Sequence, residues 1–300
     1  MVSILSLKNI SKSYGRIEAL KDVTFDVPGG SVFGILGPNG SGKTTLLGIV
    51  MDVLVASGGT YSWFGNPPSE KQRREIGSLL ETPNFYHYLS AQHNLEIAAA
   101  IKHKPVTDIE RVLKLVRLYE RKDSKFQTFS LGMKQRLAIA SCLLGDPSVL
   151  VFDEPTNGLD PSGIAEIRQL IIELAAIGKT IVLASHLLAE VEKVCTHVAI
   201  LQQGILIKSG DVLTALSQEE WLEVGSTEMG KLKEVLDRLP GLRRVSATGN
   251  YYQLYFNPPL PDAAWMNRYC FERGVTLNFL QVRKKSLESA FIELTNNVSN

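Results

Sequence analysis

Cysteine is scarce in this chain, which has three cysteines among 300 residues. Cys142, Cys195 and Cys270 lie far apart in apolar surroundings and lack the CxxC spacing of a zinc or redox motif. We therefore expect reduced, buried thiols, as is usual in the cytosol, and no disulfide framework.

Charge of one sign and long apolar runs are missing as well. The formal net charge is +1, which gives no sign of a surface for binding polyanions, so we expect no nucleic-acid partner. No run approaches the ~20 apolar residues that span a bilayer. The N-terminus also lacks the basic region and apolar core of a secretory signal, so we expect none. Any role at a membrane would then require a separate membrane-spanning partner.

What the chain does have is the composition of a globular protein, with 44% hydrophobic and 21% charged residues. Its length allows one large domain, or a large and a small one. We predict a large domain over residues 1–215 and a small α+β domain over 216–300.

Strands and helices alternate through the first 215 residues. Residues 4–10 and 23–27 alternate apolar and polar side chains, which is typical of half-buried antiparallel strands. The segments 31–37, 148–155 and 180–185 each contain an unbroken apolar run without alternation. They predict buried strands of a largely parallel sheet with helices on both faces. Helices are predicted at 41–54, 90–103, 106–120, 133–145, 162–178 and 187–195.

Three of these helices form a predicted helical insertion at about 85–145. Residues 197–210 predict a hairpin that turns at Gln203-Gly204. The segment 216–300 reads as a βαββαβ unit, the order of a ferredoxin-like domain, followed by an amphipathic helix at 285–297.

The stretch "GPNGSGKTT" matches the phosphate-binding pattern G-x-x-x-x-G-K-[ST] between a predicted strand and a predicted helix. Glycines let the backbone N–H groups point at phosphate oxygens, and the helix N-terminus adds positive potential. Lys43 is expected to reach the β- and γ-phosphates, and the Thr44 hydroxyl to ligate Mg²⁺. A chance glycine-rich turn is the alternative. The predicted ATP-binding residues of this P-loop are Gly37, Pro38, Asn39, Gly40, Ser41, Gly42, Lys43, Thr44 and Thr45.

Two carboxylates, Asp153 and Glu154, end the apolar run "SVLVF". Charges at the end of a buried strand are costly unless a cation faces them, and Mg²⁺ would do so. Asp153 is therefore the expected Mg²⁺ ligand, and Glu154 the residue that polarises an attacking water. A solvated turn is the alternative.

His186 directly follows the apolar run 180–185, which would place it at the same sheet edge, where it could hold the γ-phosphate and the water. A lone histidine is more often structural, and that alternative stays open. We expect the other four histidines to be surface or packing residues.

Taken in order, these motifs resemble the nucleotide-binding subunit of ABC transporters over roughly residues 1–215. The resemblance rests on "GPNGSGKTT", "FSLGMKQRLAIA", "VLVFDEPTNGLD" and "ASH". It implies an α/β P-loop NTPase fold with antiparallel β and α-helical subdomains. It also implies that Tyr14 stacks on adenine and that Asp160 lies at a dimer contact. A tyrosine that merely ends a strand is the alternative for Tyr14.

"FSLGMKQRL" falls at the family signature, which is close to L-S-G-G-Q. The resemblance implies that Ser130, Leu131, Gly132 and Met133 cover the γ-phosphate bound by a partner subunit. Phe129, Leu131 and Met133 depart from the pattern, but these side chains delete no backbone donor, and the N–H groups of Leu131, Gly132 and Met133 can still face the phosphate.

Another departure is Glu81, which stands where most members have glutamine and which could ligate Mg²⁺. Glu81 together with "SLGMKQRL" resembles the branch of bacitracin, lantibiotic-resistance and drug-export subunits.

The resemblance implies an ATPase that dimerises, with itself or a paralogue, around two MgATP and drives a separate transmembrane permease docked near residues 77–100. Such a subunit would be cytoplasmic and peripheral on the inner face of the membrane. Export of a drug, peptide antibiotic or lipid-like compound is the expected direction. The alternatives are an importer ATPase with a regulatory C-terminal domain and a soluble ABC ATPase outside transport.

Overall fold

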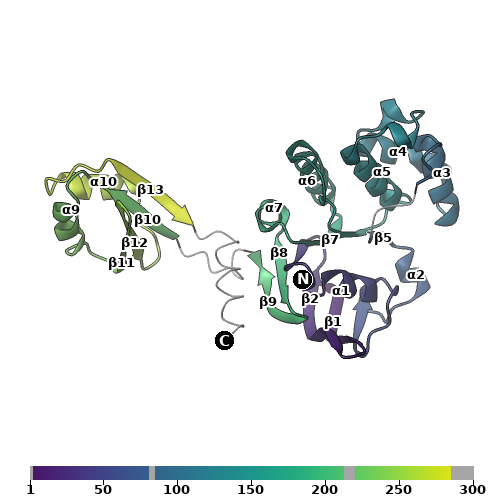
Figure 1. Ribbon diagram of the computed structural model, residues 1–300, viewed down its shortest axis with the longest axis horizontal. Helices are drawn as coiled ribbons and strands as arrows, with labels where there is room; N and C mark the ends of the chain where they lie inside the picture. The colour runs from purple at the N-terminus through teal and green to yellow at the C-terminus, as the bar shows by residue number, and fades with distance from the viewer. Residues whose placement is uncertain (1–2, 81–84, 213–219, 285–300) are drawn as a thin grey trace. The chain divides into compact units, whose positions relative to one another are not determined.

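The computed structural model describes residues 3–80, 85–212 and 220–284 (Figure 1). These residues form two compact units, the first up to residue 212 and the second from residue 220. Glu81 and the helix predicted at 285–297 lie outside the described residues. Within the described ranges, no helix is long and apolar enough to cross a membrane.

The first unit is built on a nine-stranded sheet with the order β4-β1-β2-β9-β8-β3-β7-β6-β5. β1 pairs antiparallel with β2 and β4, as the alternation of residues 4–10 and 23–27 predicts. β8, β3, β7, β6 and β5 run parallel to one another in that order, and β9 returns antiparallel to β8. The strands are β1 (Ser3–Tyr14), β2 (Ile17–Pro28), β3 (Val32–Leu36), β4 (Gly58–Trp63), β5 (Ile76–Leu79), β6 (Val149–Asp153), β7 (Thr180–Ser185), β8 (His197–Gln202) and β9 (Ile205–Asp211).

Every residue of β3 and β7 is buried, which confirms the prediction from their unbroken apolar runs. The hairpin between β8 and β9 is also confirmed, because Gln203 and Gly204 both have the positive φ of its two-residue turn. Strand β5 was not predicted from the sequence. It has only four residues, one of them Gly77, and its pairing with β6 comes from tertiary contacts.

Helices cover both faces of the parallel strands (Figure 1). α1 (Lys43–Val50) packs against β6 and β7, and on the other face α6 (Pro161–Ala176) and α7 (Leu188–Val194) pack against β7 and β3. α1 ends earlier than the predicted residue 54. Asp52 adopts a left-handed φ of 61° there, and the N–H groups of Val53 and Leu54 donate back to the Gly48 carbonyl.

The helices predicted between 85 and 145 are present and pack against one another (Figure 1). They are α3 (Ala91–Ile101), α4 (Ile109–Leu115) and α5 (Leu131–Leu143), preceded by the short α2 (Glu70–Arg73) and accompanied by 3₁₀ turns at Val106–Asp108, Tyr119–Arg121 and Phe126–Thr128. α5 also packs on β5 and α6, so the insertion is joined to the sheet through α5.

The second unit is an antiparallel sheet with the order β11-β12-β10-β13 and two helices. This is the ferredoxin-like βαββαβ topology, because the parallel strands β10 and β11 are separated by β12. Leu222, Leu254 and Met266 lie at the centre of its apolar core. Its elements are β10 (Glu220–Gly225), α9 (Met229–Leu236), β11 (Leu242–Thr248), β12 (Tyr251–Phe256), α10 (Ala263–Phe271) and β13 (Phe279–Lys284).

The three cysteines are free and buried, as expected from their apolar surroundings. Burial raises the pKa of the Cys142 thiol, which keeps this group protonated and unreactive at neutral pH.

Candidate functional site

The register of three neighbouring parallel strands brings the predicted functional residues to one edge of the sheet. Leu36 of β3 pairs with Ser185 of β7, and Asp153 of β6 pairs with Ala184. Gly37, Glu154 and His186 follow directly after these strand ends. Residues far apart in sequence therefore meet at the carboxyl ends of the strands, where open α/β sheets bind ligands.

The loop from Gly37 to Gly42 takes a shape that only glycine permits at several points. Gly40 and Gly42 have φ values of 80° and 103°. A Cβ on Gly37 would lie 2.3 Å from the Leu201 carbonyl oxygen, and one on Gly42 would lie 2.7 Å from the Ala19 carbonyl oxygen. The loop thus packs tightly against the strands and leads into the N-terminus of α1.

Lys43 is buried and folds back over this loop. Its Nζ donates to the carbonyls of Gly37 at 2.8 Å and Pro38 at 3.2 Å, and lies 3.4 Å from Glu154 Oε1. The hydroxyl of Ser41 is buried and has no hydrogen-bond partner in the described part of the chain. Two residues apart in this loop, a charged donor and a polar group without a partner are thus both present, as a site for phosphate oxygens requires.

Glu154 is the centre of the charged groups at this edge. Its Oε2 lies 2.8 Å from His186 Nδ1, while its Oε1 faces Lys43. Its backbone has a left-handed φ of 48°, which is strained for a glutamate, and its N–H donates to the Ala184 carbonyl at 3.0 Å.

From the sequence we expected a metal ion to offset the charge of Asp153 and Glu154. The contacts of Lys43 and His186 with Glu154 were not predicted. The available signal was the shared sheet edge of these three residues.

Thr44 and Asp153 supply oxygen atoms at the same edge. Each is the sequence neighbour of a residue in the Lys43–Glu154 ion pair, Thr44 exposed at the start of α1 and Asp153 half-buried at the end of β6. Hydroxyl and carboxylate oxygens are hard donors of the kind Mg²⁺ takes beside phosphates. These residues therefore fit a magnesium ion bound together with a nucleotide.

Ser130 caps helix α5, because its Oγ accepts a hydrogen bond from the Met133 N–H at 3.2 Å. Of the residues that depart from the family pattern, Phe129 is buried, whereas Leu131 is 50% exposed.

The signature and the segment 158–163 lie side by side. The Leu131 side chain lies beside Gly158, and Gly132 faces Gly163. Asp160 caps α6 by accepting from the Gly163 N–H at 3.1 Å. The fold thus places the signature next to the segment that contains Asp160.

Tyr14 ends β1 and is 46% exposed, with the Lys12 ammonium 5.0 Å from its ring centroid. An exposed aromatic ring at a strand end can stack on a planar base.

Comparison with known proteins then settles the family. The model of the ABC transporter family matches residues 20–157, which include the P-loop and Glu154. The chain is 41% identical to the uncharacterized ABC transporter ATP-binding protein YdbJ of Bacillus subtilis (strain 168), over 97% of this chain and 95% of that protein. It is 33% identical to the bacitracin transport ATP-binding protein BcrA of Bacillus licheniformis, over 98% of each.

This chain is an ABC transporter ATP-binding subunit. Its fold resembles the solved dimeric ATP-binding cassette MJ0796 bound to ADP and Pi, with a TM-score of 0.62, 27% identity and coverage of 69% of this chain and 98% of that chain. The resemblance inferred from the motifs, including the bacitracin branch, is confirmed. The ABC subunit binds and hydrolyses ATP to power transport.

Proposed function

We propose that this ABC subunit hydrolyses ATP with Glu154 as the group that activates water and His186 as the residue that orients it. The observation that carries this assignment is the strained Glu154, held between Lys43 and His186 at the strand ends. A carboxylate in contact with a histidine can polarise a water molecule beside the γ-phosphate.

Binding of ATP would rearrange the charges around Lys43. In the structure, the Lys43 ammonium contacts two loop carbonyls and the Glu154 carboxylate. A bound triphosphate would attract this ammonium away from Glu154. The same change frees Glu154 Oε1 to accept a proton from water. The ion pair between Lys43 and Glu154 thus describes a resting state, and nucleotide binding converts it into the active one.

Mg²⁺ would be held by Thr44 and Asp153, with Glu81 as a further proposed ligand outside the described residues. When bound, the ion neutralises charge on the phosphates. Tyr14 would stack on adenine, and the P-loop backbone would hold the phosphates.

Two copies, or one copy and a paralogue, would close around two ATP molecules. Support comes from the exposed, capped start of α5 and from the likeness to a cassette solved as a dimer. The signature residues 130–133 would meet the partner's nucleotide, and Asp160 would lie at the dimer contact beside them. Because the Leu131 side chain lies beside Gly158, it would not block the Leu131 backbone N–H from a phosphate.

The transported compound would be a peptide antibiotic, drug or lipid-like molecule, exported through a separate permease that docks near residues 77–100. The match to BcrA over 98% of both chains supports this direction. In this role the subunit would be cytoplasmic and attached to the inner face of the membrane through the permease.

The alternative role is an importer subunit, and the ferredoxin-like topology of the second unit would suit ligand sensing. Co-purification with the native permease distinguishes the two, because an importer would be accompanied by a solute-binding protein.

Replacing Glu154 with Gln tests the hydrolytic role. The neutral amide keeps the shape but cannot accept the proton of water, so kcat should fall at least about a hundredfold while ATP binding persists. Steady-state ATPase assays and nucleotide titration measure the two effects. Glu192→Gln, at an exposed position of α7, is the matched control. Undiminished turnover of Glu154→Gln would remove Glu154 from the mechanism.

A further inference from the structure

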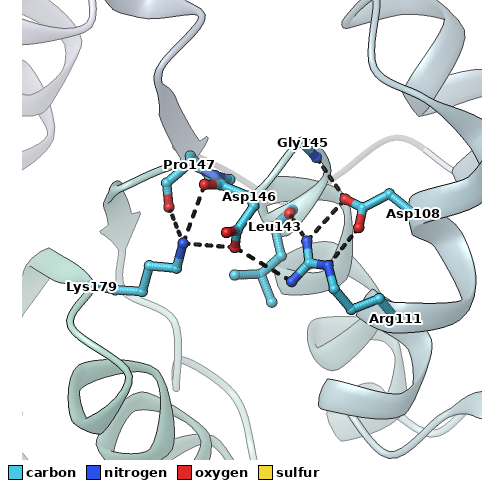
Figure 2. A network of polar contacts seen from close by, with 7 residues as sticks. All are labelled: Asp108, Arg111, Leu143, Gly145, Asp146, Pro147 and Lys179. Carbon is cyan, nitrogen blue, oxygen red and sulfur yellow. Dashed lines mark hydrogen bonds and ion pairs between the residues drawn. The ribbon is translucent and has the colours of Figure 1, made fainter.

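A network of polar contacts lies where the helical insertion meets the sheet (Figure 2). Arg111 of α4 donates to both carboxylate oxygens of Asp108 and to the Leu143 carbonyl, and lies 3.4 Å from Asp146 Oδ1. Asp108 Oδ2 also accepts from the Gly145 N–H at 2.7 Å. These contacts join the start of α4 to the loop that follows α5.

Lys179 continues the network into the sheet (Figure 2). Its side chain is 9% exposed, and its ammonium donates to Asp146 Oδ1, to the Asp146 carbonyl and to the Pro147 carbonyl. All three ammonium hydrogens thus have acceptors within two consecutive residues, which ties Lys179 closely to this loop.

The network is satisfied as a whole. Burial acts to raise the pKa of Asp108, but the hydrogen bonds from Arg111 and the Gly145 N–H outweigh it and hold that pKa below its ordinary value. Both Gly145 and Asp146 have positive φ, so the loop turns sharply between α5 and β6. A sharp turn with paired charges on both sides holds its neighbours at a defined angle.

The network connects one end of α5 to the starts of β6 and β7. Leu143 ends α5, Asp146 lies just before β6, and Lys179 lies directly before β7. The opposite ends of these same elements lead to Ser130, Glu154 and His186, respectively. The network therefore fastens the far ends of the three elements that carry the proposed catalytic and signature residues.

We propose that Asp146, Arg111 and Lys179 are positioning residues for ATP hydrolysis, which set the angle between α5 and the strands β6 and β7. This proposal rests on the proposed roles of Ser130, Glu154 and His186. It assigns to the network the angle between the signature, which would meet the partner's nucleotide, and Glu154 and His186, which would act on the nucleotide bound by this chain.

The length of α5 shows why the angle matters. Its 13 residues span about 20 Å, at 1.5 Å per residue. A rotation of about 10° at the network would therefore move Ser130 by roughly 3 Å. Misplacement by about 1 Å can cost a hundredfold in rate, so a small loss of rigidity at one end of α5 is costly at the other.

Two substitutions loosen the network without disturbing its backbone. Asp146→Asn removes one charge, and asparagine accepts the left-handed φ of 53° at this position. Arg111→Met keeps an unbranched apolar stem but removes the guanidinium and all of its donors. Glu110→Gln is the control, because it breaks the exposed Glu110–Lys114 pair on the same helix without reaching the network.

In the full chain, Arg111→Met should lower kcat about tenfold and leave KM for ATP within about twofold, because the P-loop belongs to β3 and α1. Asp146→Asn should lower kcat in the same direction. The double variant should be no worse than Arg111→Met, since both changes act through one network. Glu110→Gln should keep the wild-type kcat.

Thermal unfolding measured beside the kinetics separates positioning from stability. If both variants keep kcat within twofold while their unfolding midpoints fall, the network only stabilises the fold and the proposal is wrong. Activity that persists in Glu154→Gln but falls in Arg111→Met would instead reject the proposed role of Glu154 and retain the network as a positioning element.

Discussion

The two units of this protein use charged side chains in opposite ways. In the first unit, Lys43, Glu154 and His186 meet at the strand ends around a strained backbone, beside a buried hydroxyl that lacks a partner. In the second unit, Glu223 accepts hydrogen bonds from Trp221, Gln253 and Arg283, all on the same sheet. The first arrangement leaves capacity for a ligand, whereas the second satisfies its charge internally.

The difference separates polar groups that can contact a ligand from polar groups that hold the fold in place. Buried charge that completes its own hydrogen bonds contributes to stability, and charge held in strain beside unsatisfied groups is expected at sites that bind. Substitutions in the two units should therefore affect different measurements.

The largest effect on ATP binding is expected for Lys43→Ala in the first unit. Loss of a buried ammonium beside the loop carbonyls removes the charge that would pair with phosphate, so ATP affinity should fall about 10- to 100-fold. Isothermal titration calorimetry with ATP measures this change. Lys71→Ala, at an exposed position of α2, is the control. An unchanged affinity in Lys43→Ala would place the phosphates elsewhere.

A smaller effect is expected for Tyr14→Ala, which removes the exposed ring at the end of β1. Stacking of a base on an aromatic ring contributes about 1–3 kcal/mol, so KM for ATP should rise roughly tenfold with little change in kcat. Tyr14→Phe keeps the ring and should behave as the wild type. If Tyr14→Ala has a normal KM, Tyr14 is only a strand-end residue.

The smallest effect on activity is expected for Glu223→Gln in the second unit, which should keep kcat and KM. Burial acts to raise the pKa of Glu223. The hydrogen bonds donated by Trp221, Gln253 and Arg283 outweigh this effect and hold that pKa below its ordinary value of 4.5. The folded state therefore favours the carboxylate, and its contribution of about 1–2 kcal/mol is present above pH 4.5.

That contribution is lost as the pH falls through the lowered pKa of the folded protein. Urea unfolding of wild type and Glu223→Gln should differ at pH 7 and converge in acid. Glu234→Gln, an exposed change on α9, provides the control. Equal stability of Glu223→Gln and wild type at pH 7 would show that these hydrogen bonds contribute nothing net.

Much of the first unit could be predicted from local patterns. The unbroken apolar runs of β3, β6 and β7 and the alternation of β1 and β2 indicate their environments directly. Strand β5 and the early end of α1 could not be predicted in this way. A strand of four residues forms because it pairs with a neighbouring strand, and the left-handed backbone of Asp52 depends on local packing.

The candidate site divides in the same way. The P-loop is a short continuous segment, and the spacing of its glycines predicts the tight, left-handed backbone turns that Gly37–Gly42 adopts. The contacts of Glu154 with Lys43 and His186 join residues more than thirty positions apart, so they depend on strand register. The network of Asp108, Arg111, Asp146 and Lys179 has no motif at all and becomes visible only in three dimensions (Figure 2).

By itself, the sequence determined that this chain is an ABC ATP-binding subunit, because glycine spacing, strand ends and the signature are properties of short segments. The tertiary structure alone decided which charges face one another and how the far ends of α5, β6 and β7 are held together. Such contacts depend on the order and register of strands that are distant along the chain, and no local pattern of residues encodes them.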